Sequence, residues 1–146
     1  MAFGSVLIVD DDADGLAWVR ELLELEGYAT FVAVDGVDAL AIARRFRPDL
    51  ILLDLRMPVM DGRAFRREQA DDPAIADIPV VCMSAEPDVA AVARALNAAA
   101  YLCKPVDASR LLQALDAAGV SPWSGQGRPG PTDPGDAGAG SAPDLR

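Results

Sequence analysis

Short apolar runs alternate with longer amphipathic stretches over most of the chain. The runs cover residues 6–9, 30–33, 50–53, 79–83 and 101–103. Those at 6–9, 50–53 and 79–83 are continuously apolar, which is typical of strands buried on both faces of a sheet. Between the runs, apolar residues recur at helical intervals of three and four, as in Leu16, Val19, Leu22 and Leu23. The pattern predicts five strands alternating with five helices.

Polar residues and glycines mark where these helices begin and end. Aspartates stand at three expected N-cap positions: Asp35, Asp61 and Asp107. Gly27 follows the first helix, as a C-terminal glycine should. Asp12 and Asp14 are expected to do no more than cap the first helix, and the Asp61-Gly62 pair to begin the third.

The alternation and the short connections predict an α/β fold. Strands that alternate with helices form a doubly wound parallel sheet, with helices on both faces and right-handed crossovers. In such sheets, ligands bind beyond the carboxyl ends of the strands.

Composition divides the chain of 146 residues near Gly119. From Ser121 to Arg146, 11 of 26 residues are Pro or Gly, and Leu145 is the only large aliphatic side chain. Such a segment cannot bury enough apolar surface to offset the entropy of ordering. We expect one folded domain over residues 1–119 and a linker or disordered tail over residues 120–146, with Trp123 undocked.

The charge and the rare residue types exclude several functions. The formal net charge is −10, which argues against a nucleic-acid partner. The chain has no histidine, so histidine-dependent catalysis and histidine-ligated metals are excluded. Cys82 and Cys103 are too few for a four-ligand metal site and are expected to be small core residues. No run approaches the roughly 20 apolar residues of a membrane span, and the N-terminus does not resemble a signal peptide. We therefore expect a cytoplasmic protein without a membrane partner.

Charged and hydroxyl side chains stand at the ends of four predicted strands: Asp10, Asp11, Asp54, Ser84 and Lys104. Three carboxylates brought together repel one another and remain ionised only beside a cation. Carboxylate oxygens suit Mg²⁺, which also binds phosphate oxygens. A carboxylate can itself accept a phosphoryl group, whose oxygens Mg²⁺, the only lysine and a hydroxyl would neutralise.

Four segments carry a resemblance to a known family. They are LIVDDD at 7–12, LLDLRMPVMDG at 52–62, VVCMSAE at 80–86 and YLCKP at 101–105. Together, over about residues 4–119, they resemble the response-regulator receiver domain of two-component signalling, in particular a single-domain, chemotaxis-regulator-like member. The resemblance implies a flavodoxin-like sheet with strand order 2-1-3-4-5, flanked by five helices.

The resemblance also implies a phosphorylation site that uses Mg²⁺. Asp54 matches the aspartate that becomes 4-aspartylphosphate. Asp11 matches a direct Mg²⁺ ligand, Asp10 an acid that holds the ion through water, and Arg56 the residue that supplies a backbone carbonyl. The resemblance implies a sensor histidine kinase or a histidine phosphotransfer protein as donor. This chain has no histidine of its own, so a partner or a small phosphodonor must supply the phosphoryl group.

Three further residues match the family's switch. Lys104 matches the lysine that binds a phosphoryl oxygen, Ser84 the switch hydroxyl, and Tyr101 the aromatic residue that turns inward as the hydroxyl moves. The interval from Ser84 to Lys104 is slightly shorter than usual, so the fourth helix is expected to depart from the family's geometry.

Arg56 and Glu86 carry a separate hypothesis about the lifetime of the phosphorylated state. Each lies two positions after a site residue, Asp54 or Ser84. An ion pair between them would cover the mouth of the site and slow attack by water on phosphorylated Asp54.

Several alternatives remain open from the sequence. The leading interpretation is a phospho-acceptor switch with slow self-dephosphorylation, not an enzyme with ordinary turnover, acting on an unidentified downstream protein. The chain would be a stand-alone receiver or a receiver cut from a larger regulator. A haloacid-dehalogenase-like phosphohydrolase would instead use Asp10 of the Asp10-x-Asp12 motif as nucleophile, leaving Asp54 unexplained. A third alternative is a receiver-like interaction module that is never phosphorylated.

Overall fold

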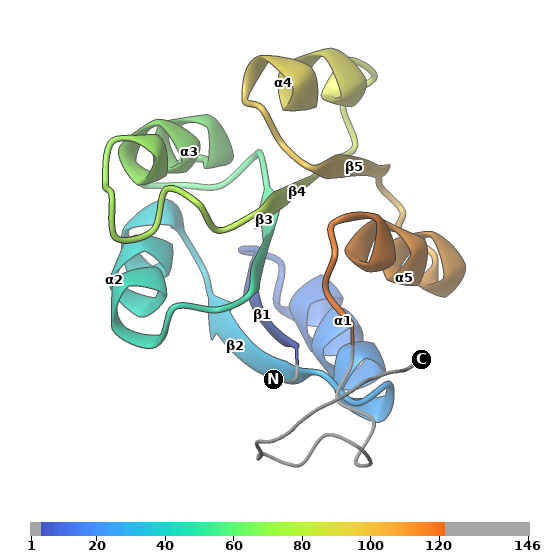
Figure 1. Cartoon of the computed structure of the whole chain (residues 1–146). Helices are drawn as coiled ribbons and strands as arrows, with labels where there is room; N and C mark the ends of the chain where they lie inside the picture. Colours follow the sequence, from blue (N-terminus) through green and yellow to red (C-terminus); the bar gives the residue numbers. More distant parts are fainter. Residues whose placement is uncertain (1–3, 122–146) are drawn as a thin grey trace.

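Five parallel strands form one sheet in the computed structural model, which describes residues 4–121 (Figure 1). The spatial order is β2-β1-β3-β4-β5, which confirms the expected flavodoxin-like topology. The strands are β1 (Ser5–Val9), β2 (Ala29–Ala33), β3 (Leu50–Asp54), β4 (Val80–Ser84) and β5 (Ala100–Cys103).

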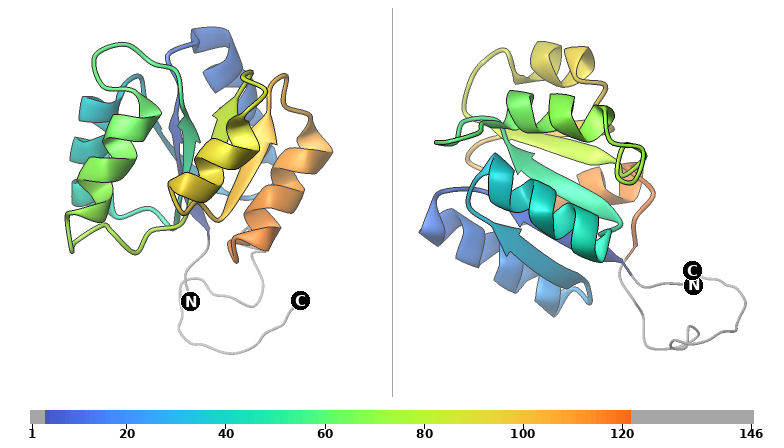
Figure 2. Two further views of the ribbon diagram at one scale, coloured as in Figure 1. Left: turned by 90° about the horizontal axis from the view of Figure 1, so that it is seen from above. Right: turned by 90° about the vertical axis from the view of Figure 1, so that its left-hand side faces the viewer.

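Five helices cover the two faces of the sheet. They are α1 (Ala13–Leu25), α2 (Gly36–Phe46), α3 (Gly62–Ala70), α4 (Val89–Ala95) and α5 (Ala108–Ala117). Helices α1 and α5 lie on one face, and α2, α3 and α4 lie on the other (Figures 1 and 2). The predicted doubly wound α/β architecture is therefore confirmed.

The apolar strands divide the core in two because successive side chains of a strand point to opposite faces. In β1, Val6 and Ile8 pack with the helices α1 and α5, whereas Leu7 and Val9 pack with α2, α3 and α4. Every residue of β3 and β4 is buried. The central strands are thus held on both sides, which fixes the positions of the residues at their carboxyl ends.

The predicted helix ends are found, with one exception. The carboxylates of Asp35, Asp61 and Asp107 each accept the backbone N–H three residues later, at 2.8–2.9 Å. Gly27 follows α1 with a positive φ of 100°. Asp12 stands at the N-cap of α1, but its side chain accepts no hydrogen bond there. Its backbone N–H instead donates to Asp10, so the start of α1 is tied to the strand-end acid.

The structure bears on two expectations about α4 and β5. Helix α4 has only seven residues, in keeping with the short interval between Ser84 and Lys104. The expectation that both cysteines lie in the core is right for Cys82, which is buried, and wrong for Cys103, which is exposed. The reason is that β5 is an edge strand, and its alternate residues Tyr101 and Cys103 face away from the core.

The chain after α5 packs against the start of the sheet. Val120 is buried, its carbonyl accepts a hydrogen bond from the Tyr28 hydroxyl, and the Ser121 carbonyl accepts one from Gly4. The described fold therefore continues to Ser121, slightly past the predicted boundary at residue 119. The rest of the predicted tail, including Trp123, lies outside the described residues. Within residues 4–121, no helix is long and apolar enough to cross a membrane.

Candidate functional site

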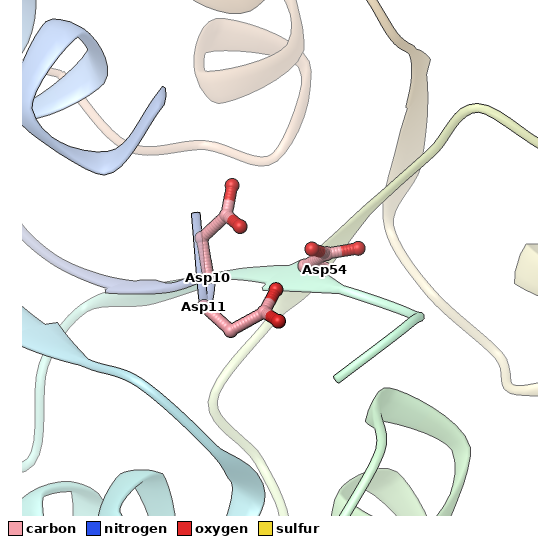
Figure 3. A group of neighbouring side chains, drawn as sticks. All are labelled: Asp10, Asp11 and Asp54. Carbon is pink, nitrogen blue, oxygen red and sulfur yellow. The ribbon is translucent and has the colours of Figure 1, made fainter. Parts of the chain in front are cut away.

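Three carboxylates from two neighbouring strands meet at the carboxyl edge of the sheet (Figure 3). Asp10 and Asp11 directly follow β1, and Asp54 ends β3. One carboxylate oxygen of each lies within 4.8 Å of the others. Asp10 and Asp54 are each only 4% exposed, whereas Asp11 faces solvent. The predicted cluster of three acids is therefore present. Asp11 is accessible to a ligand, and Asp10 and Asp54 are buried.

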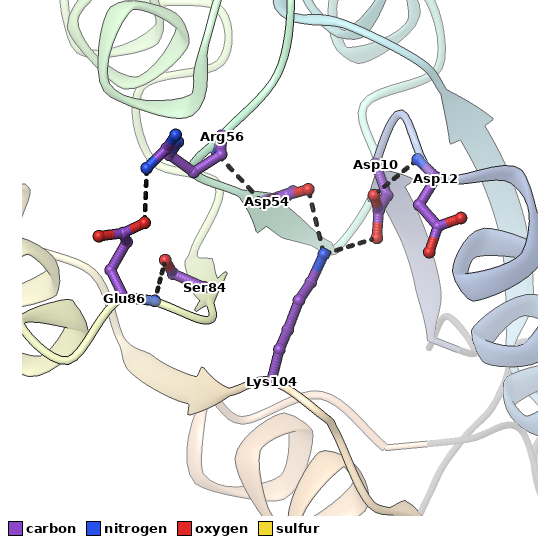
Figure 4. A network of polar contacts seen from close by, with 7 residues as sticks. All are labelled: Asp10, Asp12, Asp54, Arg56, Ser84, Glu86 and Lys104. Carbon is purple, nitrogen blue, oxygen red and sulfur yellow. Dashed lines mark hydrogen bonds and ion pairs between the residues drawn. The ribbon is translucent and has the colours of Figure 1, made fainter.

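Lys104, which directly follows β5, contacts two of these acids (Figure 4). Its Nζ donates to Asp54 Oδ2 at 3.1 Å and to Asp10 Oδ2 at 3.2 Å. The backbone N–H of Lys104 donates to the Ser84 carbonyl, which anchors the lysine to the end of β4. The single lysine of the chain therefore bridges the ends of β1, β3 and β5.

The protonation of the site follows from burial and these contacts. Burial raises the pKa of Asp54; the Arg56 N–H and Lys104 oppose this, while the adjacent Asp10 adds to it. Burial by itself lowers the pKa of Lys104, but the attraction of Asp54 and Asp10 outweighs it and raises that pKa overall. A buried carboxylate with a raised pKa is stabilised in its charged form by a further cation. The acids present therefore fit a divalent metal with oxygen ligands, and Asp10, Asp11 and Asp54 could hold it.

The loop after β3 and the end of β4 form the rim of the site. The backbone N–H of Arg56 donates to Asp54 Oδ1 at 3.1 Å, and Ser84 Oγ accepts the Glu86 N–H at 3.0 Å. The Arg56 guanidinium and the Glu86 carboxylate form the hypothesised ion pair, at 2.5 Å (Figure 4). Ser84 itself is buried.

Tyr101, the aromatic residue that the resemblance assigns to the switch, lies apart from this network. Tyr101 is 47% exposed and faces outward from β5. The Lys104 ammonium thus contacts the acids directly and Ser84 is joined to the Lys104 backbone, whereas Tyr101 faces away from them.

Gly62 supports the site in a way that the sequence interpretation missed. A Cβ at this position would lie 2.6 Å from the Asp54 carbonyl oxygen and 2.8 Å from the Leu55 Cα. Glycine is disfavoured inside helices. A glycine in the first turn of α3 therefore indicates that another part of the backbone lies too close for a side chain. The Asp61-Gly62 pair begins the helix, as predicted, and also lets α3 pack directly beneath the residue that ends β3.

Comparison with known proteins gives the family. The sequence profile of the response regulator receiver domain matches residues 6–116. The chain belongs to this family, whose members are phospho-acceptor switches of two-component systems.

Relatives and solved structures agree with this assignment. The chain is 33% identical to the polar-differentiation response regulator DivK of Brucella anthropi, over 76% of this chain and 92% of DivK. It is 41% identical to the transcriptional regulatory protein PrrA of Mycobacterium tuberculosis, over 77% of this chain but only 48% of PrrA.

Among solved structures, the chemotaxis protein CheY4 of Vibrio cholerae superimposes with a TM-score of 0.73 at 32% identity, over 79% of this chain and 98% of CheY4. The receiver domain of a Pseudomonas aeruginosa sensor histidine kinase, solved with a magnesium ion in its active-site cleft, has a TM-score of 0.72 at 26% identity, covering 81% of this chain and 99% of that domain.

Proposed function

We propose that Asp54 is the phospho-acceptor of this receiver domain. The observation that carries the proposal is the position of its carboxylate, at the end of a buried strand and bound by Lys104. A carboxylate oxygen of Asp54 attacks the phosphorus of a partner's phosphohistidine. The new O–P bond forms as the P–N bond breaks, and the released imidazole nitrogen takes up a proton.

The surrounding residues supply positioning and charge for this transfer. Asp10, Asp11, Asp54 and the backbone carbonyl of Arg56 would hold Mg²⁺, which would neutralise phosphoryl oxygens and the crowded acids. The Lys104 ammonium binds a second phosphoryl oxygen. Its point charge suits one oxygen in a narrow site better than a planar guanidinium would.

Ser84 and Tyr101 would convert phosphorylation into a change of surface. The Ser84 hydroxyl, which now accepts the Glu86 N–H, would turn to donate to the phosphoryl group. Tyr101 would move inward from its exposed position. The surface formed by α4, β5 and α5 would then differ between the two states and select an unidentified downstream protein.

The domain accepts one phosphoryl group on Asp54 and does not turn over repeatedly as an ordinary enzyme does. Its donor is a partner protein, a sensor histidine kinase or a histidine phosphotransfer protein, and we infer that it works in the cytoplasm. A stand-alone regulator resembling DivK and a receiver within a longer regulator resembling PrrA are both compatible with its relatives.

Mapping the phosphorylated residue tests the proposal. The protein is incubated with MgCl₂ and acetyl phosphate, and its mass and its peptides are analysed. We expect one phosphoryl group on Asp54 and none in Asp54→Asn. A phosphoryl group on Asp10 would instead indicate the phosphohydrolase, and no modification would indicate an interaction module that is not phosphorylated.

A further inference from the structure

The loop between β3 and α3, residues 55–61, carries part of the phosphorylation site. Arg56 lies in it, and its backbone N–H donates to Asp54 while its carbonyl is a proposed Mg²⁺ ligand. The start of α3 holds the base of the loop, since the Gly62 N–H donates to the Leu55 carbonyl. Arg56 is continuous with the outer part of the loop, residues 57–60. A contact that fixes residues 57–60 therefore also constrains the Arg56 backbone.

The outer part of the loop does not hold itself in place. Val59 has a φ of 66°, which is unfavourable for a β-branched residue. The Met60 N–H donates to the Pro58 carbonyl at 2.7 Å across Val59, forming a three-residue turn. The Val59 side chain is 82% exposed, so its own packing does not offset the unfavourable backbone. A contact from elsewhere in the fold must stabilise the turn.

Gly36, the first residue of α2, makes that contact. Its N–H donates to the Met60 carbonyl at 2.9 Å. A Cβ at position 36 would lie 2.5 Å from Met60 Cγ, 2.7 Å from the Met60 carbonyl oxygen and 2.8 Å from Met60 Cβ. The backbone oxygen cannot move aside as a flexible side-chain end can. Gly36 is therefore needed for close approach.

We propose that Gly36 is a positioning residue of the phosphorylation site. By admitting the Met60 backbone against the first turn of α2, it fixes the loop and hence the Arg56 carbonyl and N–H around Asp54. The inference rests on the proposed function, because it assigns Gly36 a role in Mg²⁺ binding and phosphorylation at that same site.

The variant Gly36→Ala tests the role. The added methyl group displaces Met60, so we expect weaker Mg²⁺ binding and slower phosphorylation of Asp54 by acetyl phosphate. Small displacements of positioning groups have large effects on rate, and we expect a loss on the order of tenfold in both quantities. Mg²⁺ affinity is measured from amide chemical shifts during titration with MgCl₂, without any phosphodonor.

Gly4→Ala is the matched control. A Cβ at position 4 would also overlap a backbone oxygen, that of Ser121, but at the opposite edge of the sheet. This variant is expected to lose thermal stability while keeping the wild-type Mg²⁺ affinity. Equal losses of Mg²⁺ affinity in the two variants would show a general effect of destabilisation and overturn the inference.

A second variant covers the case in which Gly36→Ala does not fold. The double variant Gly36→Ala/Met60→Ala removes the Met60 Cγ that the new methyl group would meet but leaves the overlap with the Met60 carbonyl oxygen, so it should fold more readily and still bind Mg²⁺ more weakly than the wild type. Unchanged Mg²⁺ affinity in a folded Gly36→Ala protein, or in the folded double variant, would overturn the inference even if wild-type Asp54 is phosphorylated. Failure of the wild type to be phosphorylated would instead overturn the proposed function.

Discussion

At the scale of single residues, the sequence was sufficient to identify several residues of the site. It was not sufficient to predict the contacts between their side chains. Asp10, Asp54 and Lys104 were recognisable because each stands at the end of an apolar strand, where parallel topology brings side chains together. That the Lys104 ammonium bonds to both acids depends on the exact depth of each side chain, which only the folded chain defines. The sequence interpretation also missed Gly36, because the close approach of Met60 to Gly36 is a tertiary contact.

Replacing Lys104 by arginine should impair the switch although it preserves the charge. The guanidinium is wider than the ammonium and cannot donate to Asp10 and Asp54 from the same point. The proposed bond from Lys104 to a phosphoryl oxygen is a hydrogen bond between charged groups, which contributes about 1.5–3 kcal/mol, so its loss corresponds to roughly tenfold or more in the switching equilibrium. The measurement is the change in amide chemical shifts around Ser84 on addition of beryllofluoride and MgCl₂. A wild-type response in Lys104→Arg would contradict the assigned role.

Removing either partner of the Arg56–Glu86 ion pair should shorten the lifetime of phosphorylated Asp54. The two side chains are 67% and 42% exposed, so the pair contributes little to folding but covers the rim of the site. A surface pair contributes at most about 1 kcal/mol, which corresponds to at most about fivefold in the decay rate. Decay is followed by loss of the labelled phosphoryl group from Arg56→Ala and Glu86→Ala.

Arg20→Ala provides the control for this measurement. It breaks the comparably exposed Arg20–Glu24 pair on α1 and should leave the decay rate unchanged. Wild-type decay in both Arg56→Ala and Glu86→Ala would reject the hypothesis.

At the scale of helices and strands, a buried polar side chain connects elements that the apolar pattern treats separately. Gln69, in the last turn of α3, is fully buried. Its Nε2 donates to the Ile75 and Ile78 carbonyls, and its Oε1 accepts from Arg66, whose Nε donates to the Leu96 carbonyl after α4. Helix α3 is thereby joined to the segment that leads into β4 and to the end of α4. Hydrophobic spacing does not predict this network, because it links two polar side chains to the backbone carbonyls of Ile75, Ile78 and Leu96.

Gln69→Leu should destabilise the fold by about 1–3 kcal/mol, since it removes a donor from buried carbonyls and adds no cavity. The measurement is the free energy of unfolding in urea. Gln113→Leu, on the exposed face of α5, makes the same chemical change without buried partners and should be close to neutral. Equal effects of the two substitutions would show that the network contributes nothing to stability.

At the scale of the whole molecule, the sequence predicted the topology well because its signals are local and repeated. Each observed strand falls within a residue or two of an apolar run, and the aspartates at the helix starts are side-chain caps for α2, α3 and α5. The exposure of Cys103 does not follow from the local apolar pattern: it depends on the position of β5 at the edge of the sheet, which the strand order implied by the family resemblance gives but the run of residues 101–103 does not. The packing of Val120 against Tyr28, which joins the end of the described chain to the start of β2, does not follow from that pattern either.

This closure of the fold should make its stability sensitive to alkali. Tyr28 is only 6% exposed, and its hydroxyl donates to the Val120 carbonyl. Burial, together with the charges of Asp116 and Glu26, raises the pKa of Tyr28 from 10.0 to about 12. Because the folded-state pKa is the higher one, the stabilisation is complete below pH 10 and is lost as the pH rises from 10 through about 12.

The loss should reach about 1.4 kcal/mol one pH unit above the ordinary tyrosine pKa. Urea unfolding at pH 8 and pH 11, in wild type and in Tyr28→Phe, measures it. Tyr28→Phe has no ionisable phenol at this position, so its free energy of unfolding should fall by that much less between the two pH values. Lys104, whose raised pKa also makes stability fall at high pH, is present in both proteins and cancels in the comparison. An equal fall in both proteins would show that the Tyr28 hydroxyl ionises as easily in the folded chain as in the unfolded one.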